Sequence, residues 1–61
     1  MNKLEYYRLK KGLTQPELAK LSEIEQSEIS RAEKGLKDLK GFEWLSLANA
    51  LDCTVDELLG K

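Results

Sequence analysis

Five polar side chains in the segment 26–34 have the types and spacing of a hydrogen-bonding surface on one side of a helix. On a helical wheel with 3.6 residues per turn, they fall within one sector of about 140°. The sector contains Gln26, Ser27, Ser30, Arg31 and Lys34. Ile29 and Ala32 fall on the opposite side, where an apolar core is expected. The segment therefore offers an amide, two hydroxyls and two cations from one face.

The chemistry that this face can perform is the recognition of nucleic-acid bases through hydrogen bonds. Gln26 can pair bidentately with adenine, and Arg31 with guanine, in the major groove of DNA. Ser27 and Ser30 can each contact a base edge or a phosphate. We therefore predict that these four side chains form a base-reading surface.

Three lysines extend this surface beyond the expected helix. Lys34, Lys37 and Lys40 lie on or beside the loop that follows it. Ammonium groups at these positions can contact the phosphate backbone and supply the salt-dependent part of the affinity for DNA. They are the predicted phosphate ligands of the loop.

Carboxylates beside the segment argue against DNA binding, because DNA is a polyanion and repels them. Glu23 and Glu25 precede the expected helix, and Glu28 and Glu33 lie at the two margins of its polar sector. None of them falls inside the sector, so their number does not exclude a DNA-facing surface. Glu28 precedes Arg31 by three residues, which is the spacing of a surface ion pair on a helix. We expect Glu23, Glu25 and Glu28 to lower the affinity for non-specific DNA.

The elements that position these side chains are all predicted to be helical. The expected helices span residues 2–11, 14–21, 26–34, 41–51 and 54–60. Gly12 and Gly35 are expected to end the first and third helices. Thr14 with Glu17, and Thr54 with Glu57, have the spacing of a capping box at a helix start. The chain therefore reads as an all-α domain.

Apolar residues at helical spacing predict the core of this domain. The expected core side chains are Leu18, Ala19 and Leu21, then Ile24 and Ile29 between the second and third helices, then Trp44, Leu47, Ala48 and Leu51. Most of the aromatic residues, Tyr6, Tyr7, Phe42 and Trp44, are expected in the core or at its rim, and Cys53 is expected to be buried. Leu45, Leu58 and Leu59 exceed what this core needs, and we expect them to form an association patch.

Length and composition exclude several classes of protein. A chain of 61 residues corresponds to a single domain over residues 1–61. It has no histidine and one cysteine, so we expect no metal site, no internal disulfide and no enzyme active site. No apolar run approaches the roughly 20 residues of a membrane span, so we expect a cytoplasmic protein without membrane contact. No cofactor or small-molecule ligand is expected.

The segment from Leu13 to Gly35, with its flanking residues, resembles a known family. The matching residues are "GLTQ" (12–15), "ELA" (17–19), Ile24, "IS" (29–30), Arg31 and "EKG" (33–35), and "LANALDCTVDELL" (47–59) resembles the family's fourth and fifth helices. This is the Cro and phage-repressor type of helix-turn-helix, often called the XRE family. The resemblance implies a compact five-helix, lambda-repressor-like domain with a central helix-turn-helix.

The same resemblance implies roles for individual residues. It places base contacts at Gln26, Ser27 and Arg31, and a phosphate contact at Gln15. It also implies a structural ion pair between Arg8 and Glu33. Glu23 departs from the pattern, because the family usually has glycine in this turn. We expect a left-handed backbone at Glu23, which costs on the order of 1 kcal/mol for a residue with a side chain.

We therefore expect a sequence-specific regulator of transcription that binds double-stranded DNA, with repression as its output. The family usually binds as a dimer, so we expect a homodimer through the C-terminal region and a palindromic operator. The alternative is a protein–protein interaction module on the same fold, with weak or no DNA binding. The acidic margins of the reading helix favour the alternative, whereas Gln26, Arg31 and the lysine-bearing loop oppose it.

Overall fold

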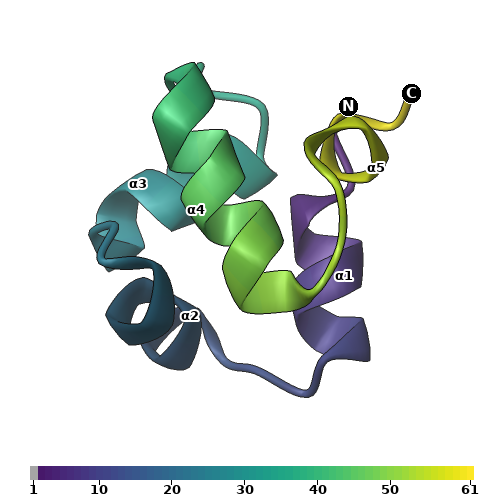
Figure 1. The fold of residues 1–61 in the computed structure, drawn as a ribbon. Coiled ribbons are helices and arrows are strands. Elements are labelled where there is room, and N and C mark those ends of the chain that lie inside the picture. The colour runs from purple at the N-terminus through teal and green to yellow at the C-terminus, as the bar shows by residue number, and fades with distance from the viewer. Residues whose placement is uncertain (1) are drawn as a thin grey trace.

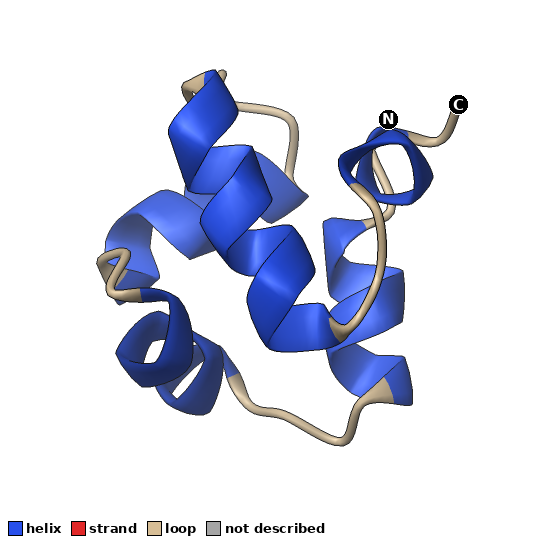
Figure 2. Cartoon of the chain, viewed as in Figure 1, coloured by secondary structure: helices blue, strands red, loops and turns tan. Residues whose placement is uncertain are grey.

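The computed structural model describes residues 2–61, and these residues form five helices and no strand (Figure 1; Figure 2). The helices are α1 (Leu4–Lys10), α2 (Gln15–Ser22), α3 (Gln26–Glu33), α4 (Gly41–Leu51) and α5 (Val55–Leu59). The all-α, five-helix prediction is confirmed. None of the helices within residues 2–61 is long and apolar enough to cross a membrane.

The fourth helix lies at the centre of the arrangement (Figure 1). It packs against α2 on one side and α5 on the other, while α3 packs against α2 and α1. The N-terminal segment connects α3 to α5. The Asn2 side chain donates to the Ala32 carbonyl at 2.7 Å. The Lys3 amide likewise donates to the Leu58 carbonyl at 2.7 Å. These contacts hold the C-terminal end of α3 and α5 to the start of the chain.

A threonine caps the N-terminus of α2 and another that of α5, as predicted. Thr14 Oγ1 accepts a hydrogen bond from the Glu17 amide, and the Glu17 carboxylate accepts one from the Thr14 amide. Thr54 and Glu57 repeat this reciprocal arrangement at the start of α5. Each capping box satisfies backbone N–H groups that a helix leaves unpaired at its N-terminus. Because the signal lies within four consecutive residues, both boxes were predicted correctly.

The core contains the apolar stripe that was predicted for α4. Trp44, Leu47, Ala48 and Leu51 are all buried. Leu18, Ile24 and Ile29 fill the space between α2 and α3, and Leu4, Ala32, Leu39 and Leu58 complete the buried cluster. This packing fixes which side of α3 faces solvent.

Leu21 was predicted to face the core, and this prediction is wrong. Its side chain is 60% exposed, whereas Ser22 is buried. Ser22 follows Leu18 by four residues and so lies on the same face of α2. Its hydroxyl donates to the Leu18 carbonyl at 2.7 Å, which satisfies the polar group inside the domain. The orientation of α2 against α4 therefore places a serine, and not the leucine, on the inner face.

Two of the four aromatic residues lie outside the core, although most were expected in it or at its rim. Trp44 is buried and Tyr7 is half-buried, but Tyr6 and Phe42 are exposed, Phe42 by 68%. Phe42 precedes the buried Trp44 by two residues, which is about 200° around a helix. Tyr6 follows the buried Leu4 by the same interval. Both side chains therefore point away from the core.

The turn between α2 and α3 has the left-handed backbone that was predicted. Glu23 has φ 58° and ψ 32°, and it directly follows the last residue of α2. A side chain in this conformation brings Cβ close to the backbone carbonyl, which glycine avoids. The turn thus holds a residue with a side chain in a backbone conformation that favours glycine.

Glu23→Gly is expected to raise the free energy of unfolding by about 1 kcal/mol, because it removes this steric cost. In a domain of this size the melting temperature should rise by about 4–8 °C. Thermal melting followed by circular dichroism measures the change.

Two control variants separate backbone strain from charge and chain entropy. Glu23→Gln removes the charge and keeps the side chain, and Glu25→Gly places glycine at an ordinary φ of −62° in the same turn. Glycine at that position only increases the entropy of the unfolded chain. A Glu23→Gly variant that melts no higher than Glu25→Gly would contradict the strain at Glu23.

Candidate nucleic-acid interface

The third helix presents the predicted polar face to solvent. That face carries the exposed side chains of Gln26, Ser27 and Arg31, with Ser30 half-buried at its edge and Lys34 exposed at the helix end. On the opposite side, Ile29 and Ala32 are completely buried. Because the core side of α3 is held by these two residues, the polar face cannot turn inward without exposing them. The structure thus brings the four predicted base-reading residues to one surface.

Arg31 is the side chain on this face with the greatest hydrogen-bonding capacity. Its guanidinium has five N–H donors in a planar fork that matches the O6 and N7 acceptors of guanine. Within residues 2–61 it forms no ion pair and no hydrogen bond. The fork is therefore free to bind an external partner.

Glu33 lies on the core side of α3, where Arg8 of α1 binds it. Arg8 Nε donates to Glu33 Oε2 at 2.6 Å, and a second guanidinium nitrogen lies 3.3 Å from Oε1. Both side chains are almost fully buried, at 9% and 5% exposure. A third nitrogen of Arg8 donates to the Leu13 carbonyl at 2.9 Å, and the Glu33 carboxylate raises the pKa of Arg8. The pair ties α1 to α3 and removes one carboxylate from the polar face.

The amide of Gln15 reaches the same carboxylate. Gln15 Nε2 donates to Glu33 Oε1 at 2.9 Å, although 18 residues separate them. Gln15 is the first residue of α2 and is half-buried. Glu33 therefore holds Gln15 in place beside the N-terminus of α2, where backbone N–H groups favour anions. Gln15 was predicted to contact phosphate, but its hydrogen bond to Glu33, which links two segments far apart in the chain, was not predicted.

The spacing of Glu28 and Arg31 allows a surface ion pair, but the two side chains form none in the structure. Glu28 Oε1 instead binds Lys37 Nζ at 2.9 Å, and Arg31 remains free. This bond, with the charge of Glu28, raises the pKa of Lys37. Lys37 belongs to the loop between α3 and α4, and that loop brings its ammonium to the start of α3. Glu28 thus binds a cation nine residues away in the chain and not the one three residues away on its own helix.

The other charged residues around α3 are exposed. Glu23 and Glu25 lie in the turn that precedes the helix, and the Glu25 side chain makes no capping hydrogen bond within the described chain. Lys34 and Lys40 lie at the two ends of the α3–α4 loop. Lys34 therefore borders α3 at its C-terminal end, and Glu23 and Glu25 precede its N-terminal end.

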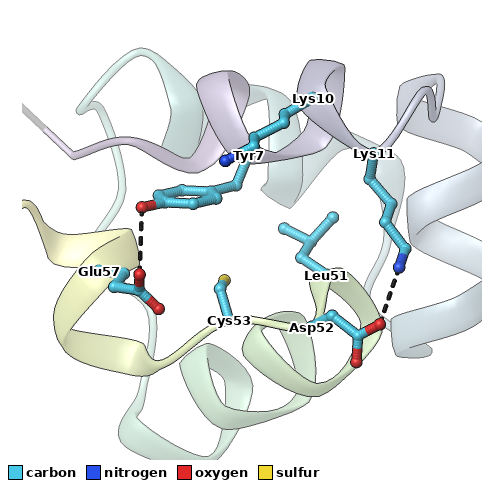
Figure 3. A pocket seen from close by; sticks show the side chains of 7 residues that line it. All are labelled: Tyr7, Lys10, Lys11, Leu51, Asp52, Cys53 and Glu57. Carbon is cyan, nitrogen blue, oxygen red and sulfur yellow. Dashed lines mark hydrogen bonds and ion pairs between the residues drawn. The ribbon is translucent and has the colours of Figure 1, made fainter.

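A shallow pocket of about 280 Å³ lies elsewhere, at the end of α1 (Figure 3). Its lining consists of Tyr7, Lys10, Lys11, Leu51, Asp52, Cys53 and Glu57. Two of its charges are paired internally, because Lys11 Nζ lies 2.8 Å from Asp52 Oδ2 (Figure 3). Cys53, which was expected to be buried, is half-buried, and its burial raises the pKa of its thiol. Lys10 and Lys11 thus lie outside the α3 surface.

Comparisons with known proteins agree with this geometry. The helix-turn-helix family model matches residues 4–58. Among solved structures, the chain is similar to the restriction-modification controller protein C.AhdI from Aeromonas hydrophila, with a TM-score of 0.87 and 38% sequence identity. That similarity covers 92% of this chain and 85% of the controller protein. No curated protein matches the chain.

Proposed function

Because the chain belongs to the Cro and phage-repressor (XRE) type of the helix-turn-helix family and is a DNA-binding transcription regulator, we propose that α3 reads base edges in the major groove. The observation that carries this proposal is the exposed face of α3. Gln26, Ser27 and Arg31 are accessible there, and Arg31 is unpaired within the described chain. These side chains have the donors and acceptors that distinguish adenine and guanine in the major groove.

Phosphate contacts are proposed at the two ends of the reading surface. Gln15 lies at the start of α2, held by Glu33, and can donate to a phosphate beside the helix N-terminus. Lys34 and Lys40 are exposed and can contact the backbone on the far side. Such contacts orient a protein on the duplex, whereas the base contacts carry sequence information. Lys37 differs from these residues because Glu28 already binds its ammonium group.

We expect the regulator to act as a homodimer through an exposed apolar surface on α4. Phe42 and Leu45 are 68% and 54% exposed, and their spacing of three places them on one side of that helix. Leu59 is half-buried. Leu58, which the sequence analysis assigned to the same patch, is completely buried and is excluded from it. A two-fold dimer with its reading helices about 34 Å apart fits a palindromic operator.

Repression is the output that we expect, because a protein seated in the groove of a promoter blocks access to that DNA. The similarity to a restriction-modification controller protein supports a regulatory role.

Selection from a random-sequence duplex pool tests the proposed function. Fluorescence anisotropy first establishes binding at low salt, and rounds of enrichment then identify the bound sequences. We expect a palindromic motif whose half-sites are about 10 base pairs apart, or a multiple of this spacing. A single asymmetric motif would contradict the dimer, and binding without any enriched motif would contradict base reading by α3.

A further inference from the structure

The loop between α3 and α4 contains three lysines that the fold treats differently. Lys34 and Lys40 are exposed, and the described residues offer no ion-pair partner to either ammonium. Lys37 is half-buried, and its Nζ lies 2.9 Å from Glu28 Oε1. One of the three cations is therefore already bound within the protein before any DNA arrives.

The position of this pair matters because it lies beside the reading helix. Glu28 is in the first turn of α3, and its side chain is 30% exposed. The Lys37 side chain is 36% exposed, and the charge of Glu43 in α4 also acts on its ammonium. Two carboxylates from two helices thus favour the charged form of Lys37, and the charge of Arg31 opposes them.

A phosphate and a carboxylate compete for the charge of the same ammonium group. Lys37 has three N–H donors, but Glu28 already neutralises its charge. Lys37 acts as a full cation toward a phosphate only if it leaves Glu28, which would then stand unpaired next to a polyanion. Lys34 and Lys40 meet no such cost. Lys37 is consequently the cation of this loop that a DNA phosphate recruits least readily.

We propose that Glu28 withholds Lys37 from DNA phosphates and thereby lowers the affinity for non-specific DNA. The inference rests on the proposed function, because it requires α3 to face DNA. Non-specific binding comes almost entirely from cation–phosphate contacts, whereas operator binding also draws on base contacts. Withholding one cation lowers the affinity for every duplex by the same factor, so base contacts supply a larger share of the affinity that remains for the operator.

The experiment measures binding to a fixed duplex without the selected motif, over a range of salt concentrations. Glu28→Gln should release Lys37 and steepen the slope of log K against log salt by about 0.9, the value of one phosphate contact. Affinity at 0.1 M salt should rise by up to about eightfold. Glu25→Gln is the matched control, since it removes a neighbouring carboxylate that has no cation bound within the described chain. Its slope should stay at the wild-type value.

Lysine variants identify the cation that is released. In the wild-type background, Lys37→Gln should leave the slope unchanged, whereas Lys34→Gln should reduce it by about 0.9. The double variant Glu28→Gln with Lys37→Gln should return to the wild-type slope. Circular dichroism establishes that each variant retains the helical fold.

Two results would overturn the inference and leave the proposed function intact. One is an equal slope for Glu28→Gln and Glu25→Gln, and the other is an equal loss of slope for Lys37→Gln and Lys34→Gln. A folded wild-type protein that binds no duplex even at low salt would overturn the proposed function itself, and the inference with it.

Discussion

Replacing Arg8 by methionine is expected to lower the free energy of unfolding by about 3–5 kcal/mol. The substitution leaves the Glu33 carboxylate buried without its cation, and an unpaired buried charge is strongly unfavourable. A domain of 61 residues has a total stability of about 3–9 kcal/mol at ordinary values per residue. Arg8→Met should therefore lose between about a third and all of this stability. Urea denaturation followed by circular dichroism measures the difference.

The double variant Arg8→Met with Glu33→Leu is the control for this prediction. Replacing both members of a buried ion pair by apolar residues of similar size is often neutral or stabilising, because no uncompensated charge remains. The double variant should recover most of the lost stability, apart from the donor that the Leu13 carbonyl loses. Equal stabilities for the single and double variants would show that the cost does not come from an unpaired Glu33.

The same variants test whether the buried Glu33 carboxylate affects DNA binding through Gln15. Glu33 also accepts a hydrogen bond from Gln15, so the folded double variant leaves that amide free to move. We expect it to bind the selected motif more weakly than the wild type while it keeps the same base preference. This follows because Gln15 is proposed to contact phosphate, and phosphate contacts carry no sequence information.

Arg31→Ala has the largest expected effect on DNA binding. Loss of one bidentate contact to guanine costs about 1–3 kcal/mol of discrimination at each half-site. Affinity for the selected motif should fall by about 5- to 150-fold per half-site, and the preference for guanine at that position should disappear. Because Arg31 is exposed and unpaired within the described chain, its loss should change the unfolding free energy by no more than about 0.5 kcal/mol. Fluorescence anisotropy on the motif and on single-base variants of it measures both effects.

Arg31→Lys separates the shape of the guanidinium from its charge. Lysine keeps the cation but lacks the planar fork, so the salt slope should stay near the wild-type value while the preference for guanine weakens. If Arg31→Ala instead binds the selected motif as tightly as the wild type, α3 does not read DNA through this residue. The alternative of a protein–protein interaction module would then be favoured, and α3 would be tested against protein partners.

The features that the sequence by itself determined are those whose causes lie within a few consecutive residues. The capping boxes at Thr14 and Thr54, and the buried stripe of α4, follow from spacings of three and four residues. The polar face of α3 follows in the same way, because one helical repeat decides which side chains share a side. The left-handed turn at Glu23 was expected from the family resemblance, and the backbone has that conformation.

Only the tertiary structure decided which neighbours these elements meet. Helical periodicity allowed either Leu21 or Ser22 on the inner face of α2, and the packing of α2 against α4 selected Ser22. The partners of the charged and polar side chains were settled in the same way, since Lys37 meets Glu28 and Gln15 meets Glu33 across 9 and 18 residues of chain. Hydrogen bonds and ion pairs depend on distances of about 3 Å between atoms. Distances on that scale between separate segments are set by how the helices pack, which local spacing does not encode.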